Sequence, residues 1–281
     1  MNAPIVSVII PVFNNELYFG KCIDSVLYQS LHDIEVIIVN DGSTDNSIKI
    51  VEERIRLDDR IKVIHLPGPF GAGVARNKGI ESASGKWIAF LDSDDYFPDK
   101  YVLELLVETS LKHDADVCGG SLYTVDSQDQ IINKSIKYQV FNEEGWIKYD
   151  DYQFEGGFYR FIYRSDIVKN KISFPELMRY QDPGFLVKIL SFTQKFYSVA
   201  HYTYAYRKYK NIEMNNDILC DIFSGIEIVY NISKHNSYKR LMQRMHYVYW
   251  KVFFKNFKRI IKSKRCFFQS LKILFSIYSP M

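Results

Sequence analysis

The first 120 residues alternate between two hydrophobic patterns. Continuous apolar runs of strand length, rich in β-branched residues, are separated by longer segments whose apolar positions recur every three to four residues. The runs predict strands at residues 5–10, 34–40, 61–66, 87–91 and 116–123. The longer segments predict helices at residues 15–31, 43–55, 71–84 and 98–113. Asn14 is placed to cap the first helix, and Pro98 falls in the first turn of the last.

Buried strands that alternate with helices indicate a mostly parallel sheet with helices on both faces. We therefore predict an α/β fold. The pattern loosens after about residue 124, where only the segment 183–194 has clear helical spacing. Because we find no internal repeat and no low-complexity linker, we do not divide the fold before about residue 215.

Polar and acidic residues gather where three of the predicted strands end. Parallel sheets of this kind bind ligands at the carboxyl ends of their strands, and the sequence there reads PVFN, NDGS and DSDD. The last of these holds Asp92, Asp94 and Asp95, whose like charges repel one another. Mg²⁺ or Mn²⁺ bridging a diphosphate would offset this repulsion, because such ions take one or two carboxylates plus phosphate oxygens and water. Helix capping is the alternative, and it suits Asp95 best.

For two further residues, the sequence alone leaves two possible roles open. Asp41 follows the second strand, where it could accept a hydrogen bond from a nucleobase or ribose, or act only in a turn. Arg76 follows Gly71-Ala72-Gly73, which is too short for a dinucleotide-binding fingerprint. Its guanidinium would face the ligand edge or extend into solvent.

Four segments together resemble the family 2 glycosyltransferases, which are inverting enzymes of the GT-A fold. They read VSVIIPVFNNELYFGKCIDSVLYQS, IEVIIVNDGSTDNS, GAGVARNKGIESASGKWIAFLDSDD and, later, ISFPELMRYQDPGFLVKIL. The first three cover residues 6–95 almost without interruption, in the order and spacing of the family. The resemblance implies a GT-A catalytic domain at 1–215, with a nucleotide-sugar half at 1–123 and an acceptor half at 124–215.

The resemblance also implies the roles of individual residues. Asp41 would read uracil, Arg76 would lie near the diphosphate, and Asp94 would bind Mn²⁺ or Mg²⁺ directly. The remaining residues expected around the nucleotide-sugar are Pro11, Val12, Phe13, Asn14, Glu16, Asp92 and Ser93, with Asp92 nearer the ribose and sugar and also beside the metal.

Asp182 matches the catalytic base of the family. Relatives often carry Glu-Asp at this point, whereas this chain has Gln181-Asp182. Losing the neighbouring carboxylate is expected to lower the pKa of Asp182, because one like charge is gone. A helix N-cap is the structural alternative for Asp182, and Glu155 is the reserve candidate for the base. The segment 155–165, EGGFYRFIYRS, departs from the Trp and Lys of many relatives, so the acceptor is not identified.

Bulk composition narrows the class of protein. The 281 residues are 47 % hydrophobic and 25 % charged, as in ordinary globular proteins. The four cysteines form no CxxC pair, which indicates neither a zinc site nor a disulfide framework and fits a reducing compartment. We find no signal-peptide pattern and no run of 18 apolar residues, so we expect a cytoplasmic protein.

The C-terminal segment differs from the rest in charge. Residues 238–281 hold eleven Lys or Arg and no Asp or Glu, although the net charge of the whole chain is only +3. In a helical projection six of these cations lie within about 40° of one line. They are Arg240, Arg244, Lys251, Lys255, Lys258 and Lys262.

Most of the remaining circumference is apolar or aromatic, including Met245, Tyr249 and Phe254. We expect a helical extension at 216–281 that lies on the inner face of the plasma membrane with its aromatic residues in the bilayer. A helix packed on the catalytic domain, with a solvated basic stripe, is the alternative. A second basic segment, Tyr206-Arg207-Lys208, could contact the diphosphate or form a solvated turn.

These observations predict an inverting transferase that moves a hexosyl or N-acetylhexosaminyl group from a UDP-sugar to a saccharide hydroxyl. The expected acceptor is a lipid-linked oligosaccharide in bacterial surface polysaccharide synthesis, and no nucleic acid partner is expected. A nucleotidyltransferase of related fold is a rival, but its glycine-rich, Arg-containing loop is missing after the first strand. An inactive nucleotide- or carbohydrate-binding scaffold is the other rival, and the intact aspartates oppose it.

Overall fold

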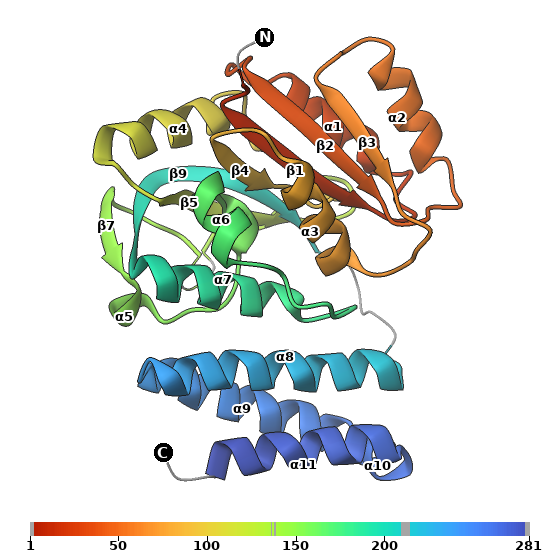
Figure 1. The fold of residues 1–281 in the computed structure, drawn as a ribbon, viewed down its shortest axis with the longest axis vertical. Helices are drawn as coiled ribbons and strands as arrows, with labels where there is room; N and C mark the ends of the chain where they lie inside the picture. The colour runs from red at the N-terminus through yellow and green to blue at the C-terminus, as the bar shows by residue number, and fades with distance from the viewer. Residues whose placement is uncertain (1–2, 136, 138, 209–213, 279–281) are drawn as a thin grey trace.

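A computed structural model describes residues 3–135, 137, 139–208 and 214–278. One twisted sheet crosses the upper part of the molecule, with helices on both of its faces, and a layer of helices lies beneath (Figure 1). The α/β fold class predicted from the hydrophobic pattern is confirmed.

The N-terminal half contains the predicted strands and helices. The strands are β1 (Val6–Val12), β2 (Ile34–Asn40), β3 (Ile61–His65), β4 (Trp87–Phe90) and β5 (Val117–Val125). The helices are α1 (Phe19–Leu27), α2 (Ser47–Ile55), α3 (Ala72–Ser82) and α4 (Val102–His113).

Three of the predicted helices begin four residues later than expected: α2 begins at Ser47 rather than at residue 43, and α1 and α4 begin equally late. Helix α1 begins at Phe19, and Asn14 does not cap it; its Oδ1 instead accepts a hydrogen bond from the Thr44 backbone N–H at 2.7 Å. Helix α4 begins at Val102, so Pro98 precedes it. In both places a loop at the ligand edge occupies residues that local propensity assigns to a helix.

The second half completes the sheet. It contains β6 (Ile131–Asn133), β7 (Gly145–Lys148), α5 (Tyr149–Tyr152), the 3₁₀ turn η1 (Phe158–Arg160), β8 (Phe161–Arg164), α6 (Ser165–Lys171), α7 (Gln181–Thr193) and β9 (Lys195–Arg207). The strand order is β3-β2-β1-β4-β8-β5-β9-β7, and β6 pairs with β5. Strands β3, β2, β1 and β4 are parallel, whereas β8 runs antiparallel to both of its neighbours. The sheet is therefore mixed beyond β4 rather than mostly parallel.

Two apolar cores lie on the two faces of the sheet, because successive β1 side chains point to opposite sides. Val8 and Ile10 pack with residues of α1 and α4, and Ile9 packs with residues of α3 and α7. Phe90 of β4 faces the second core, where aromatic rings from η1, α7 and the loop before α7 surround it. Because Phe174 belongs to the loop before α7, this core holds that loop in place.

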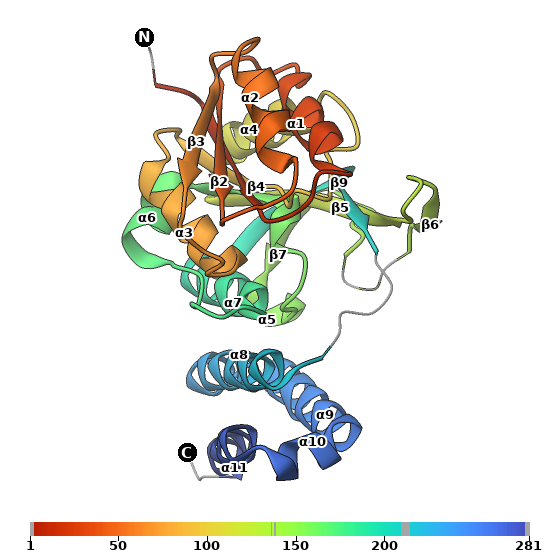
Figure 2. The same cartoon turned by 90° about the vertical axis from the view of Figure 1, so that its right-hand side faces the viewer.

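The C-terminal segment forms four helices: α8 (Asn216–His235), α9 (Lys239–Lys255), α10 (Phe257–Lys262) and α11 (Lys264–Tyr278). Helix α8 lies between α7 and the lower helices α9 and α11 (Figures 1 and 2). The single basic helix expected from the projection is interrupted at Asn256. Met245 and Tyr249 are buried in the core that α8 shares with α7 and the sheet, so their expected insertion into a membrane is wrong. No helix in the described ranges is long and apolar enough to cross a membrane.

Candidate active site

The loop after β1 forms one wall of a cavity at the carboxyl edge of the sheet. The cavity has a volume of about 400 Å³ and is lined by Phe13, Asn14, Asn15, Leu17, Tyr18, Ser93 and Asp94. The Asn15 side chain donates a hydrogen bond to Ser93 Oγ at 2.9 Å, which joins this loop to the acidic turn. Phe13 is 45 % exposed, so a ring is available at the mouth of the cavity.

Other residues expected at the nucleotide have structural roles in the described chain. Pro11 and Val12 are buried in β1, so any contact with a nucleotide would involve their main chain. Asn14 bonds the start of the β2–α2 loop, and Glu16 accepts hydrogen bonds from the backbone and side chain of Asn46. These bonds hold the first two loops of the ligand edge together.

Asp41 organises the loop between β3 and α3. Its carboxylate accepts hydrogen bonds from the backbone N–H of Phe70 and, at 2.7 Å, from that of Gly71. Gly71 has a φ of 96°, a conformation that favours glycine, and it is followed by α3. Asp41 therefore sets the start of the helix that carries Arg76.

Asp95 is buried and is not the helix cap expected from the sequence. Its carboxylate accepts hydrogen bonds from the Tyr204 hydroxyl at 2.7 Å and from the Arg207 backbone N–H at 2.6 Å. The same Tyr204 hydroxyl accepts a hydrogen bond from the Asp92 backbone N–H. Burial and the charges of Asp94 and Asp92 raise the pKa of Asp95 well above its ordinary value. Asp95 thus ties the end of β9 to the acidic turn.

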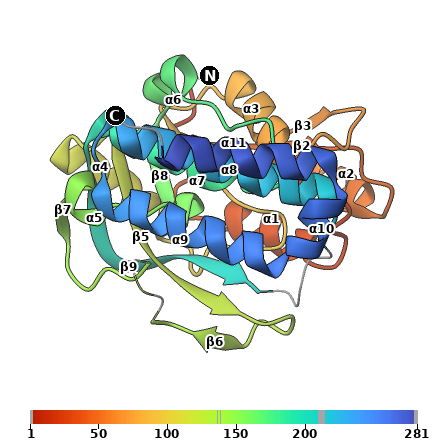
Figure 3. The same cartoon turned by 90° about the horizontal axis from the view of Figure 1, so that it is seen from below.

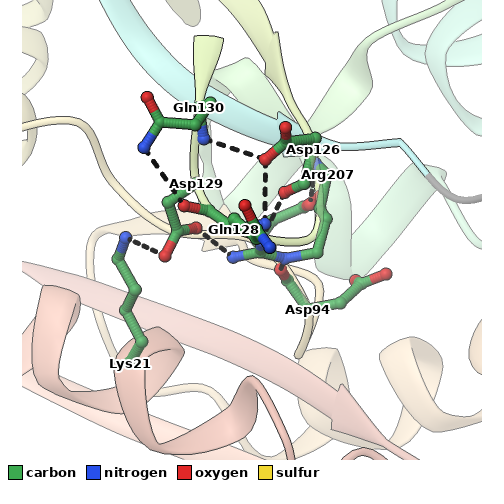
Figure 4. A network of polar contacts seen from close by, with 8 residues as sticks. Lys21, Asp94, Asp126, Gln128, Asp129, Gln130 and Arg207 are labelled. Carbon is green, nitrogen blue, oxygen red and sulfur yellow. Dashed lines mark hydrogen bonds and ion pairs between the residues drawn. The ribbon is translucent and has the colours of Figure 1, made fainter. Parts of the chain in front are cut away.

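Arg207 is the centre of a polar network around that turn (Figure 4). Its guanidinium donates hydrogen bonds to the Asp94 carbonyl at 2.8 Å, to the Asp126 carbonyl at 2.7 Å and to the Asp129 carboxylate. The carboxylate of Asp129 also pairs with Lys21 of α1 at 2.9 Å. The Arg207 side chain is only 1 % exposed. Arg207 therefore neither lies in a solvated turn nor faces the cavity. It anchors the main chain of Asp94.

A stack of tyrosines lies next to the acidic turn. The Tyr159 ring stacks on Tyr204 at 4.2 Å and on Tyr206 at 5.6 Å between ring centroids. Burial raises the pKa of Tyr206, and the nearby carboxylates raise it further, Asp95 most strongly. Tyr159 comes from the segment 155–165, so this segment contacts the end of β9 through stacked rings.

Arg76 joins the acidic turn to the distant residue Asp182. Its guanidinium donates to Asp92 Oδ1 at 2.5 Å and to Asp182 Oδ1 at 2.8 Å. The arginine side chain is 3 % exposed, and the rings of Phe158 and Phe174 lie 4.7 and 5.1 Å from its central carbon. Such rings favour a cation at this position. The two carboxylates that the sequence assigned to different tasks therefore bind one guanidinium.

The pKa of Asp182 is raised, which corrects the expectation of a lowered value. Burial is the largest cause, Arg76 opposes it, and the charge of Asp92 adds to it. The sequence argument counted only the neutral neighbour Gln181 and missed burial and a carboxylate from another loop. The Asp182 side chain remains 35 % exposed, so it reaches the cleft from the first turn of α7.

The C-terminal helices support the segment directly before α7, the helix whose first turn carries Asp182. Tyr180, directly before α7, has a φ of 65°, which is uncommon for a residue with a side chain. Gly225 of α8 lies against it; a Cβ at Gly225 would meet the Tyr180 carbonyl oxygen at 2.6 Å. Asp221 of α8 accepts a hydrogen bond from the Met178 backbone N–H at 2.7 Å. Helix α8 is thus a structural part of the site.

Glu155 is wrong as the reserve base. Its carboxylate is buried and pairs with Arg244 of α9 at 2.5 Å. Arg244 also lies over the Phe154 ring at 5.0 Å. The pair joins the C-terminal helices to the catalytic part, and a carboxylate held in this way is not placed to accept a proton from a substrate.

The acidic turn fits a diphosphate-bound cation better than a protein-enclosed one. Within the described residues no group of three or more His, Cys, Asp or Glu side chains could hold a metal ion. Mg²⁺ bound to phosphates needs only one or two carboxylates. Asp94 meets this need, because it lines the cavity and its carboxylate points away from Arg207 (Figure 4). Asp92 is less suited to direct binding, since Arg76 occupies its Oδ1.

The family model for glycosyl transferase family 2 matches residues 7–172, more than half of the chain. The chain belongs to glycosyl transferase family 2. The match includes Asp41, Arg76 and the acidic turn but ends before Asp182. The role of Asp182 therefore depends on its geometry in this family 2 chain.

Curated relatives support the same family. The chain is 35 % identical over 217 residues to the putative glycosyltransferase EpsH of Bacillus subtilis, a match that covers 74 % of this chain and 62 % of EpsH. It is 46 % identical over 110 residues to the putative teichuronic acid biosynthesis glycosyltransferase TuaG of Bacillus subtilis, covering 38 % of this chain and 44 % of TuaG. The chain thus spans less than two thirds of these relatives.

Solved structures of TarS from S. aureus share the fold. The structure of TarS 1–349 in complex with UDP-GlcNAc matches 97 % of this chain and 80 % of its own, with a TM-score of 0.74 and 21 % identity. The match extends over nearly all of the chain, so its fold as a whole is similar to that of TarS.

Proposed function

We propose that this transferase moves a hexosyl or N-acetylhexosaminyl group from a UDP-sugar to a saccharide hydroxyl, with inversion at the anomeric carbon. The observation that carries the proposal is the bridge from Asp92 through Arg76 to Asp182. It brings the acidic turn, where a nucleotide diphosphate would bind, onto the same cleft as a carboxylate able to accept a proton. Direct displacement needs these two functions on opposite sides of one sugar.

The donor site in this proposal is the cavity between the first loop and the acidic turn. Phe13 and Asn14 would contact the nucleoside, with Asp41 near the uracil and Ser93 near the ribose. TarS has been crystallised with UDP-GlcNAc and with UDP, and its fold is similar. These structures support a UDP-sugar as donor here, and they leave the sugar itself to experiment.

Asp94 would hold Mn²⁺ or Mg²⁺ together with the diphosphate, and Asp92 would lie beside it. The cation would neutralise charge on the departing UDP. The chain's own contribution is to fix the turn: Arg207 holds the Asp94 carbonyl, and Asp95 holds the end of β9.

Asp182 would accept the proton of the attacking hydroxyl, which is general-base catalysis. Arg76 holds one carboxylate oxygen of Asp182 and leaves the other for the acceptor. The charge of Arg76 also lowers the pKa of Asp182 and so opposes the effect of burial. Phe158 and Phe174 shield this ion pair on the protein side.

The acceptor in this proposal is a lipid-linked oligosaccharide in the synthesis of a bacterial surface polysaccharide, at the inner face of the plasma membrane. The relationship to TuaG, which is described as a teichuronic acid biosynthesis enzyme, supports a polysaccharide product.

The test is UDP release from a panel of UDP-sugars with Mn²⁺, for the unmodified protein, Asp94→Ala and Asp59→Asn. Asp59 is an exposed aspartate that serves as the matched control. We expect slow hydrolysis of one donor, lost in Asp94→Ala and retained in Asp59→Asn. Mn²⁺-dependent UDP binding without release from any donor, with or without saccharide acceptors, would instead indicate an inactive scaffold.

A further inference from the structure

The lower surface of the molecule is formed by α9, α10 and α11 (Figure 3). On α9 the buried residues Leu241, Met245 and Tyr249 follow one another every four positions, toward the core shared with α8. Tyr247 and Phe254 lie on the opposite side of the helix and are 66 % and 69 % exposed. Two large aromatic side chains therefore point away from the protein on this helix.

Helix α11 repeats this arrangement. Cys266, Ser270 and Ile273 are buried, and the Cys266 sulfur lies 2.7 Å from that of Cys220 on α8. Phe268 and Phe275 are seven positions apart and lie on the side away from α8, with exposures of 67 % and 75 %. Because both side chains are mostly exposed, they contribute little to packing within the chain.

Cations accompany these aromatic residues. Lys251 on α9 and Lys258 on α10 are exposed, and residues 238–281 contain no Asp or Glu. We define the aromatic–basic face by six exposed residues: Tyr247, Lys251, Phe254, Lys258, Phe268 and Phe275. Single exposed apolar residues are common on soluble proteins, but several on one surface mark an interaction site.

We propose that the aromatic–basic face lies on the surface of an anionic lipid bilayer. Aromatic rings partition into the zone between headgroups and acyl chains, and lysines pair with anionic headgroups. The excess of basic over acidic residues lies in the segment that forms this face, because residues 1–237 carry 25 Lys or Arg against 33 Asp or Glu. The rest of the chain would be repelled by anionic lipid, so the charge distribution orients the protein with this face down.

The arrangement also sets the height of the active site above the bilayer. Helix α8 lies between α7, whose first turn carries Asp182, and the helices α9 and α11 that contribute to the face (Figures 1 and 2). Two layers of helices, each about 10 Å across, place the site roughly 20 Å from the lipid surface. Taken with the proposed lipid-linked acceptor, this height selects an acceptor already several sugars long. Other transferases must therefore act before this one.

The test is flotation of the full-length protein with vesicles, without donor or acceptor, so that its outcome is independent of the proposed reaction. Vesicles of phosphatidylcholine alone are compared with vesicles that also contain phosphatidylglycerol. We expect binding only to the anionic vesicles, weakened by salt. Replacing Lys251 and Lys258 by Gln should lower the affinity roughly fivefold per lysine. The double variant Phe268→Ser, Phe275→Ser should lower it at least tenfold at every salt concentration.

Matched controls come from exposed residues on the catalytic part. Tyr28→Ser with Leu57→Ser controls for loss of exposed apolar side chains, and Lys49→Gln with Lys112→Gln controls for loss of charge. Both controls should bind like the unmodified protein. Equal binding of the face variants and the controls would overturn the proposal. So would absence of vesicle binding together with a dimer that Phe268→Ser, Phe275→Ser dissociates, which would assign the face to a second copy of the chain.

Discussion

Replacing Arg76 by Met removes the cation that joins Asp92 to Asp182. The guanidinium is buried, and it donates to Asp182 at 2.8 Å and to Asp92 at 2.5 Å. A hydrogen bond to a charged group contributes roughly 1.5–3 kcal/mol. If the bond to Asp182 persists as the proton moves, its loss should reduce kcat/KM by about ten- to a hundredfold.

The pH dependence gives the sharper result. Burial and Asp92 raise the pKa of Asp182, and Arg76 lowers it. Without Arg76 only the weaker effect of Arg179 opposes burial and Asp92, so the pKa of Asp182 rises further. A base acts in its ionised form, so the rate is lost as the pH falls through this pKa. The acidic limb of the kcat/KM profile of Arg76→Met should therefore shift to higher pH.

The assay is UDP release across the pH range with the donor identified above. Arg76→Lys retains a charge but lacks the planar fork that reaches both carboxylates, so an intermediate loss is expected. Lys78→Met, on the same helix and exposed, is the control and should behave like the unmodified protein. An unchanged profile in Arg76→Met would refute the role of the bridge.

Three further variants test the supports of the site. Arg207→Met should raise KM for the donor about tenfold, because the Asp94 main chain loses its anchor; steady-state kinetics at saturating Mn²⁺ would measure it. Asp95→Ala should lower the free energy of unfolding by roughly 2–4 kcal/mol in urea titrations, since two buried donors lose their acceptor, whereas Asp95→Asn should retain most of it. Gly225→Ala should cost about 1–3 kcal/mol and lower kcat with little change in UDP affinity, because the new Cβ meets Tyr180. A reduced UDP affinity with unchanged kcat would contradict the last prediction.

The strands and helices of the first 120 residues were predictable because their hydrophobic period is local. Their boundaries at the ligand edge were not. Asn14 has the side chain of a helix cap, but the bond it makes goes to Thr44, thirty residues away. Local propensity carries no information about such a partner.

The distance between partners in the sequence also explains why the contacts among the site residues were not predicted. The sequence indicated Arg76 and Asp182 individually, but their contact spans 106 positions. Asp95 and Arg207 are 112 positions apart in the sequence. Without the fold, Asp95 is interpreted as a helix cap and Arg207 as part of a basic turn. Glu155 is a plausible base from the sequence alone, but in the fold it pairs with Arg244 of the C-terminal helices. For Tyr206 and Arg207 the sequence offered only one indication, which was their position at the end of a long strand-like segment.

The most direct measurement of the central claim compares UDP affinity and turnover in Asp182→Asn. If Asp182 is the base on the cleft that binds the donor, Asn keeps the shape of the side chain and should leave the Mn²⁺-dependent Kd for UDP within a few-fold. Transfer to the acceptor should fall at least a hundredfold. Transfer at the normal rate in this variant would contradict the account, whatever the affinity for UDP.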